Sequence, residues 1–175
     1  VVGTGEFRTG EHRNDGKYKF LGGVLGCDGN IYLIPCDSNH VVSVNPVTHD
    51  VRTVGPNLRG ERYVQGKWQN GFSADDGTIY AVPLKGARVL CIRPHVLDEE
   101  GGPEVTLIGG PFEGMNKWEG GVVGGDGACY CMPNNHRRVL RISPEGVGVL
   151  ESTEDVGEDV GEDVGEDVVD DVSSP

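Results

Sequence analysis

A Lys residue directly before an aromatic residue recurs at intervals of 48 and 50 residues, and at each of these three places the two could bind an anionic group. The pairs are Lys19-Phe20, Lys67-Trp68 and Lys117-Trp118. A Lys ammonium can hold a carboxylate, and an aromatic ring can stack on a flat ligand. The structural alternative is an aromatic side chain packed between neighbouring units, covered by a Lys whose charge reaches solvent.

Polar segments begin 17 or 18 residues after the Lys of each pair and supply further candidates. They are Asp37-Ser38-Asn39-His40, Lys85-Gly86-Ala87-Arg88 and Asn134-Asn135-His136-Arg137-Arg138. Their composition differs between the three segments, as is common for loops that bind partners. The candidate binding residues are Lys19, Lys67, Trp68, Lys117, Trp118, His40, Arg88, Asn135, His136 and Arg137. Their modest cationic bias favours a protein or a small anionic ligand as the partner.

No set of residues specifies a catalytic site. The motifs GxSxG and HExxH and the P-loop are absent, and no Cys-His spacing marks a nucleophile. His40 and His136 stand at different distances from the preceding Pro, so solvated loop histidines are expected instead of a shared metal site. Asp28, Asp76 and Asp126 each precede a Gly, where Asp typically forms a turn. We therefore predict no catalytic residue, no metal site and no cofactor.

The candidates recur because the chain repeats one unit, with a period of 48 and then 50 residues. The copies run over 18–46, 66–94 and 116–144. Each holds the Lys-aromatic pair, an Asp-Gly pair eight residues after the aromatic residue, a Tyr, and two Pro residues eleven positions apart. Short apolar segments separated by Gly, Asn and Pro predict several β-strands per copy. Repeats of this kind indicate a β-propeller.

We predict an all-β fold of three four-stranded antiparallel blades plus one stray strand, forming a partial or open propeller. Residues 1–14 are predicted to be the last strand of a preceding blade. Blade 1 is predicted over 15–61, blade 2 over 62–115 and blade 3 over 116–150. Each strand that ends at the second Pro should stop there, because Pro cannot donate to a strand ladder. Residues 93–103 are accordingly expected to form a longer loop.

Matching apolar residues in the third strand of each copy predict the packing between blades. Leu90 and Ile92 correspond to Val42 and Val44 and to Leu140 and Ile142, and all six should face a neighbouring blade. Between them lie Ser43, Cys91 and Arg141, on a face that we expect to tolerate polarity. Three blades cannot close a ring, since propellers have at least about four. We expect the chain either to belong to a longer chain or to self-associate and so close the ring.

The negative charge of the chain is concentrated at its C-terminal end. Residues 151–175 hold eleven Asp and Glu residues and no Lys or Arg. Three Val-Gly-Glu-Asp units in this segment predict a disordered acidic tail. The remaining residues are nearly neutral and lack the clustered cations that a nucleic-acid backbone requires. No apolar run approaches the roughly 18 residues that span a membrane. We therefore expect neither a nucleic-acid partner nor a membrane.

Five Cys residues occupy non-equivalent positions in the repeats, without a CxxC pair. Cys129 and Cys131 point to one face of a strand, which is poor geometry for a disulfide between them. We expect reduced cysteines that pack as small apolar groups, with a disulfide or a metal site as the alternative. Unpaired cysteines favour a cytoplasmic location. The compartment stays open, because the chain begins with Val and its N-terminus is expected to be incomplete.

The segment DGNIYLIPCDSNHVVSVNPVTHDVRTV, residues 28–54, resembles the YVTN- and NHL-type propeller repeats. The shared form is an Asp-Gly turn, an Ile-Tyr strand, a polar loop, a Val-rich strand and Asp/Asn-Pro-x-Thr. The Gly-Gly pairs after the Lys-aromatic pairs also resemble kelch repeats, although the kelch order is not kept. The resemblance covers residues 15–150. It implies binding through the face that carries the Lys-aromatic pairs and the polar loops, with the Asp-Gly turns on the opposite face.

The sequence favours a non-enzymatic binding or scaffold module that contacts a protein or small polar ligand through its loop face. The alternative is a propeller enzyme of lactonase or quinoprotein-like type, with its active site in the central channel. Calcium-dependent lactonases have inward acids at the channel, whereas the inner strands here carry only Glu119 nearby, and this departure argues against such an enzyme. A purely structural subunit of a larger assembly is a third hypothesis.

Overall fold

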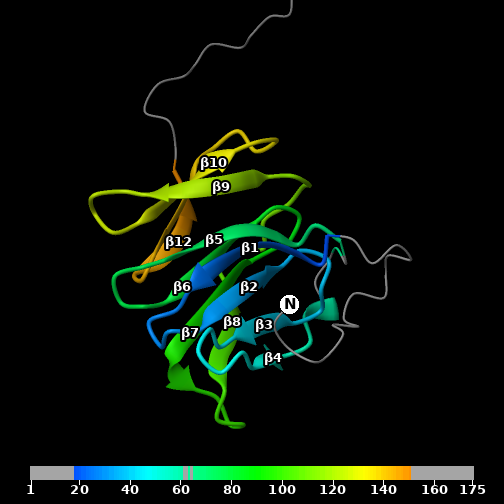
Figure 1. Ribbon diagram of the computed structural model, residues 1–175. Coiled ribbons are helices and arrows are strands. Elements are labelled where there is room, and N and C mark those ends of the chain that lie inside the picture. Colours follow the sequence, from blue (N-terminus) through cyan, green and yellow to red (C-terminus); the bar gives the residue numbers. More distant parts are fainter. Residues whose placement is uncertain (1–17, 61–62, 64, 151–175) are drawn as a thin grey trace, which may run out of the picture.

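Three four-stranded antiparallel sheets make up the computed structural model, which describes residues 18–60, 63 and 65–150 (Figure 1). Each sheet contains four strands that follow one another in the chain and pair with their sequence neighbours. The predicted stray strand at 1–14 and the predicted tail at 151–175 lie outside the described residues. Among the described residues, no helix is long and apolar enough to cross a membrane.

The three sheets are named blades 1, 2 and 3 in chain order. Blade 1 contains β1 (Phe20–Leu25), β2 (Ile31–Pro35), β3 (Val41–Val44) and β4 (Val51–Val54), and the short 3-10 helix η1 (Leu58–Gly60) follows it. Blade 2 contains β5 (Trp68–Ser73), β6 (Ile79–Pro83), β7 (Val89–Leu97) and β8 (Pro103–Ile108). Blade 3 contains β9 (Trp118–Val123), β10 (Cys129–Pro133), β11 (Leu140–Ser143) and β12 (Gly146–Val149).

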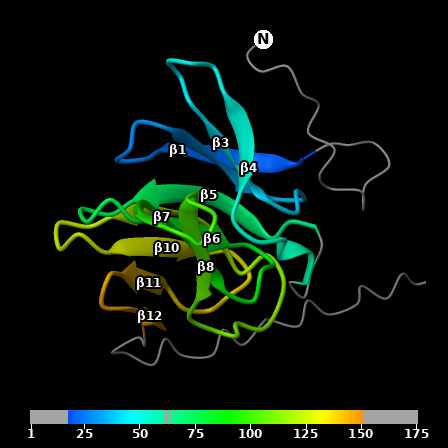
Figure 2. The ribbon, with the colours of Figure 1, turned by 90° about the horizontal axis from the view of Figure 1, so that it is seen from below.

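The blades lie one against the next in chain order, as Figure 2 shows from below. Their first strands, β1, β5 and β9, are neighbours in space. Strand order and blade order together give the architecture that the repeat predicts, and the all-β prediction is confirmed.

Asp-Gly turns join the first two strands of every blade. Gly29 and Gly77 have φ angles of +82° and +81°, a region that L-residues rarely adopt. Asp76 accepts hydrogen bonds from the backbone N–H and the hydroxyl of Thr78 at 2.9 and 3.0 Å. In blade 1, the hydroxyl of Tyr32 donates to Asp28 at 2.8 Å. The turn-forming role of these Asp residues is therefore confirmed.

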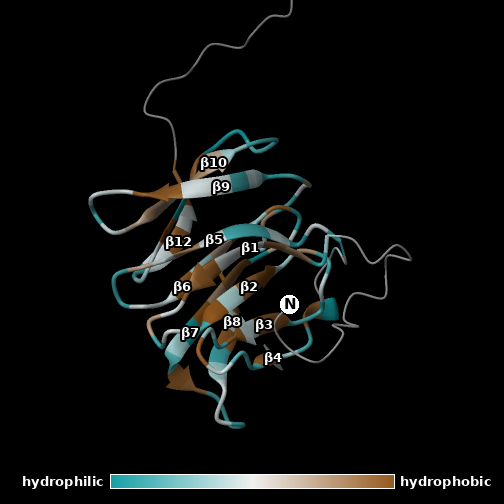
Figure 3. Cartoon of the chain, viewed as in Figure 1, coloured by the Kyte–Doolittle hydropathy of each residue, from teal (hydrophilic) through white to brown (hydrophobic). Residues whose placement is uncertain are grey.

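Two apolar cores fill the spaces between adjacent blades, and hydrophobic residues concentrate on the strands that line them (Figure 3). Leu90 and Ile92 lie in the core shared with blade 1 and are fully buried. Leu140 and Ile142 lie in the core shared with blade 2, so the predicted facing of these four residues is confirmed. The opposite face of blade 2 was expected to tolerate polarity, yet Cys91 is also fully buried there. A middle blade has a neighbour on each side, so both of its faces are interior.

Strand β7 corrects the prediction of a loop over 93–103. The strand continues through Pro94 to Leu97 and pairs with β8 as far as Pro103. The pairing shifts register between Arg93 and Leu97, and at such an irregularity Pro need not donate a ladder hydrogen bond. Arg93 also forms an ion pair with Glu104, directly opposite on β8. The long segment is thus a hairpin extension of blade 2.

All five cysteines are free thiols, and four of them are buried. Cys91, Cys129 and Cys131 belong to the core between blades 2 and 3, which confirms their predicted packing role. The sulfur atoms of Cys129 and Cys131 lie 4.0 Å apart on one strand face. Burial, followed by the negative charge of Asp37, raises the pKa of Cys36 to about 11.

Thiol labelling should separate Cys27 from the other cysteines. Near about pH 8 the Cys36 thiol stays protonated, because its raised pKa leaves little thiolate below about 11. Iodoacetamide on the folded protein, followed by mass spectrometry, should therefore modify the exposed Cys27 first, and all five cysteines only after unfolding. Rapid labelling of Cys36 in the folded protein would contradict this environment.

Candidate binding surface at the loop end of the blades

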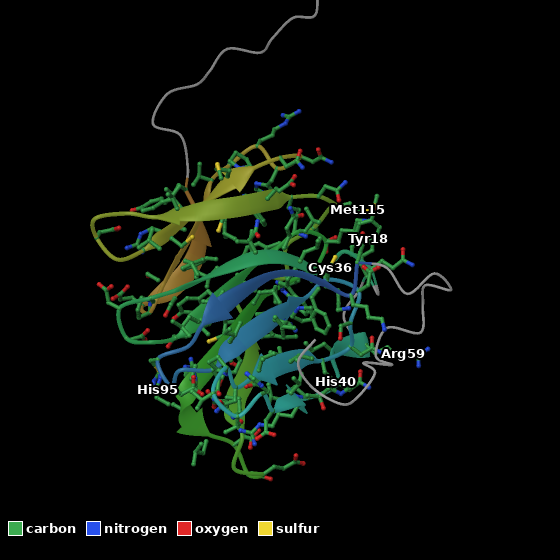
Figure 4. All side chains as sticks on the ribbon, viewed as in Figure 1. Tyr18, Cys36, His40, Arg59, His95 and Met115 are labelled. Carbon is green, nitrogen blue, oxygen red and sulfur yellow. The ribbon has the colours of Figure 1, made fainter. Side chains whose placement is uncertain are left out.

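The Lys-aromatic pairs and the polar loops lie at the same end of each blade. The backbone carbonyl of Lys19 accepts a hydrogen bond from the N–H of Cys36, at the start of its blade's polar loop, at 3.0 Å. The equivalent bonds join Lys67 to Leu84 at 3.1 Å and Lys117 to Asn134 at 2.8 Å. In Figure 4, Tyr18, Cys36 and Met115 mark this loop end, and His95 lies at the opposite, turn end.

The same Lys residues also connect each blade to the one before it. The backbone N–H of Lys67 donates to Cys36 O at 3.0 Å, and that of Lys117 donates to Leu84 O at 2.8 Å. The ammonium of Lys117 donates to Gly86 O at 2.9 Å, on the polar loop of blade 2. A longer bond of 3.3 Å reaches Gly114 O. We call this set of contacts the Lys junction.

Burial of the two Lys side chains corrects the sequence-based interpretation. A Lys that covers the aromatic ring and extends into solvent was expected, whereas Lys67 and Lys117 are 0% and 1% exposed. A buried ammonium must be compensated, because transfer of a charge from water to a protein interior is costly. At Lys117 the backbone carbonyls of the preceding blade provide that compensation. Where blade 2 joins blade 1, the buried Asp37 accepts a 2.8 Å hydrogen bond from the backbone N–H of Gly66, directly before Lys67.

The two Trp side chains of the pairs are completely buried, which confirms the packing interpretation. The indole N–H of Trp68 donates to Arg88 O, and that of Trp118 donates to Arg138 O, at 2.8 Å each. Phe112 packs edge-on against Trp118 at 5.2 Å between ring centroids. Buried donors of this kind require a partner, and here the partner is the last carbonyl of each polar loop.

The predicted site residues therefore divide into two groups. Lys67, Trp68, Lys117 and Trp118 lie below the surface, where a partner cannot touch them. The exposed or partly exposed residues are Arg88, Asn135, Arg137, Lys19, His40 and His136. His40 lies apart from the others, because it lines a hollow with Arg52 on β4 and Asp98 in the turn between β7 and β8. His136 packs on the ring of Trp118 at 4.4 Å.

Arg138 is a surface residue that the sequence analysis did not include among the candidates. It stands twenty residues after Trp118, as Arg88 stands twenty residues after Trp68. The equivalent position in blade 1 is His40. Each is the last residue of its polar loop, so a cationic or titratable side chain recurs at one place. Counting from the aromatic residue would have identified this position.

A second hollow, of about 410 Å³, lies between the first strands of blades 2 and 3. Asn70, Phe72, Glu119 and Met132 contribute to its lining. Glu119 accepts bonds from Gln69 Nε2 at 2.8 Å and from Asn134 Nδ2 at 3.1 Å, one on each carboxylate oxygen. Both oxygens are thus held by neutral amides. Within the described ranges, no group of three or more His, Cys, Asp or Glu residues is arranged to hold a metal ion.

Comparison with known proteins identifies structures with a similar fold. No family model matches the chain, and no curated protein matches it. Among solved structures, it is similar to virginiamycin B lyase from Staphylococcus aureus, with 12% identity and a TM-score of 0.55 over 79% of this chain and 43% of the lyase. It is also similar to the PQQ-bound aldose sugar dehydrogenase from Streptomyces coelicolor, with 16% identity and a TM-score of 0.50 over 73% and 45%.

An auxiliary nutrient binding protein from Bacteroides ovatus is a further neighbour, with 13% identity and a TM-score of 0.50 over 73% of this chain and 35% of that protein. The chain has a β-propeller fold. It spans less than half the length of each of these propeller-type proteins. At such low identity the likeness shows the fold alone, and the type of propeller repeat stays a prediction.

Replacement of Lys117 by Met should test the Lys junction. The change keeps most of the apolar stem but leaves the carbonyls of Leu84, Gly86 and Gly114 without the ammonium donor. We expect a loss of about 2 kcal/mol in the free energy of unfolding, measured by urea denaturation. The matched control is Lys85→Met, on the loop that contains Leu84 and Gly86. Lys85 is partly exposed, so the loss of unfolding free energy should stay within about 0.5 kcal/mol. Equal losses would contradict a special role for Lys117.

Proposed function

We propose that this chain is a non-enzymatic propeller module that binds an anionic group of a protein or small ligand at its loop end. The surface concerned consists of Arg88, Asn135, Arg137 and Arg138, and we call it the Arg rim. The observation that carries the proposal is the pair of indole hydrogen bonds, which fix the carbonyls of Arg88 and Arg138 at equivalent places. Both side chains are exposed while the backbone beneath them is anchored.

Further contacts hold the rim loops in place. The N–H of Phe112 donates to Ala87 O at 2.7 Å, directly before Arg88. Asn135 donates through its side-chain amide to Met115 O at 3.3 Å. A loop that is ordered before binding loses less conformational entropy when a partner arrives, which favours affinity. The rim is therefore a preorganised surface that carries three exposed Arg side chains.

The chemistry of guanidinium groups favours a carboxylate-bearing partner. Arg presents several N–H donors in one plane and can hold a carboxylate through two parallel bonds. Nucleic-acid binding usually requires a denser and more extended cationic patch. On the side of the blades near Asp98, Glu99 and Glu100 the surface is acidic instead. A carboxylate-bearing protein segment or small ligand thus fits the rim better than it fits that side.

A labelled poly-glutamate peptide can test the Arg rim. Its fluorescence anisotropy should rise on addition of the protein, and the apparent affinity should fall as salt is added, because exposed charges are screened. The double variant Arg88→Ala, Arg137→Ala should weaken binding by about tenfold and reduce the salt dependence. Arg138 remains in this variant.

The matched control is the double variant Arg52→Ala, Arg93→Ala on β4 and β7, which removes the same charge away from the rim. Binding by this control should stay within about twofold of that by the original protein, because its charges lie outside the contact. Equal weakening by the two double variants would indicate attraction by net charge alone. Unchanged binding by the rim variant would place the contact elsewhere, and either result would contradict the proposal.

A propeller enzyme with its active site in the central channel is the second candidate. The observation in its favour is the hollow between β5 and β9, where Glu119 is the acidic lining residue. Two of the structural neighbours are a lyase and a dehydrogenase.

The finer repeat type, YVTN or NHL with kelch-like features, is inferred from the Asp-Gly, Ile-Tyr and Asn-Pro-x-Thr elements and would not decide between the two functions.

Elemental analysis after dialysis separates the two candidates. A lactonase-type enzyme requires bound metal, whereas the binding module that we propose does not. We expect no stoichiometric Ca²⁺ or Zn²⁺ to remain with the dialysed protein. Retention of one ion per chain would favour the enzyme, and its loss in a Glu119→Gln variant would locate the ion in the channel hollow.

A further inference from the structure

Blade 3 presents to solvent the positions that blade 2 buries against blade 3. The outer face of blade 3, which we call the open face, consists of Val122, Tyr130, Met132, Val139 and Arg141. Pairing register places Val122, Tyr130 and Arg141 in one row across β9, β10 and β11. Val122 and Met132 are 63% and 51% exposed.

The residues fifty positions earlier show what this face does in the interior. They are Phe72, Tyr80, Val82, Val89 and Cys91, and all five belong to or pack against the core between blades 2 and 3. Tyr80, Val82 and Val89 are 3%, 1% and 0% exposed. The open face is therefore one half of a contact that occurs twice within the chain.

Blade 1 carries the other half of the same contact at the opposite end of the chain. Ile31, Leu33, Val42 and Val44 share its outer face, as the pairing of Ile31 with Val44 and of Leu33 with Val42 shows. Ile31, Leu33 and Val44 are partly exposed, whereas Val42 is already buried in the single chain. We call these four residues the first face. Their equivalents in blade 2 are Ile79, Ala81, Leu90 and Ile92, which are all fully buried against blade 1. Leu25, next to the first face and paired with Ile31, is 64% exposed.

The Lys junction has matching halves at the two ends as well. Lys117 donates through its ammonium to Leu84 O and Gly86 O, which lie 17 and 19 residues after Lys67. The residues at the same distances after Lys117 are Asn134 and His136, on the last polar loop. Lys19 occupies in blade 1 the place of Lys117 in blade 3. A blade 1 set against the open face would thus bring Lys19 to the carbonyls of Asn134 and His136.

We propose that two copies of this chain associate head to tail, with the open face of each packed on the first face of the other. Two such contacts close a ring of six blades, because each copy supplies three. Six lies within the usual range of about four to eight blades for propellers. Each contact joins different faces of the two copies, and the ring closes because the second contact repeats the first. Each chain covers 43% of the lyase, so two copies supply most of a propeller of that length.

The occupant is a second copy because the chain itself shows what fits the open face. Blade 2 receives blade 3, and blade 1 receives blade 2, through the same positions and the same Lys contacts. The first face of blade 1 corresponds to the faces of blades 2 and 3 that pack against the preceding blade. This proposal does not depend on the Arg rim, whose side chains belong to the polar loops.

Light scattering coupled to size-exclusion chromatography tests the proposal on the 175-residue chain. A mass of twice 18.7 kDa is expected. The double variant Val122→Lys, Met132→Lys places two charges on the open face and should run as a monomer. Both side chains are already exposed in the single chain, so the sheet should form and retain its circular dichroism spectrum. Val47→Lys, on a turn residue that is 85% exposed, is the matched control and should remain dimeric.

A second variant changes the first face instead of the open face. In the contact of blade 1 with blade 2, a Cβ built on Gly71 would meet Ile34 Cδ1 and Val24 Cγ2, both at 3.1 Å. Gly23 holds the equivalent place on blade 1, and Gly23→Lys should therefore also give a monomer. A monomeric original chain, an assembly larger than two copies, or dimers that persist in both variants would overturn the proposal.

Discussion

A buried Lys at the start of blade 2 and of blade 3 is the constraint on which the rest of the structure depends. Its backbone carbonyl holds the polar loop of its own blade, and its backbone N–H holds the polar loop of the preceding blade. At Lys117 the ammonium adds bonds to the same loop. An apolar residue could supply the packing and the backbone bonds but not the ammonium donor. The adjacent aromatic side chain fills the space below, and the indole N–H of Trp68 or Trp118 fixes the end of the loop.

This junction connects the architecture to the surface. Because the loops are held by buried donors, their exposed residues differ between blades without changing the backbone that carries them. Asn39, Ala87 and Arg137 stand at one position of the three loops, are each at least partly exposed, and differ in polarity and charge. The recurring contacts belong to the fold, and the varied side chains above them are available for recognition. Such a division is common where loops on a rigid scaffold bind partners.

Much of the fold could be predicted from the sequence because its signals are local or periodic. The Asp-Gly turns require positive φ at Gly, and alternation of apolar and polar residues along β11 shows which side of that strand is apolar. Lys117 was harder to interpret, since the carbonyls that hold its ammonium come from residues some thirty positions earlier. Pro94 suggested a strand end, although a register shift lets the strand continue. Arg138 was missed because its significance lies in a backbone carbonyl, which every residue possesses.

Native-state amide hydrogen exchange tests the central role of the Lys junction most directly. The backbone N–H groups of Lys67 and Lys117 bond to carbonyls of the preceding blade, away from any regular strand ladder. If the junction joins the blades, these two amides should exchange as slowly as those of the core strand β6, and only through global unfolding. Exchange of Lys67 and Lys117 as fast as that of the exposed turn residue Gly125 would contradict the account.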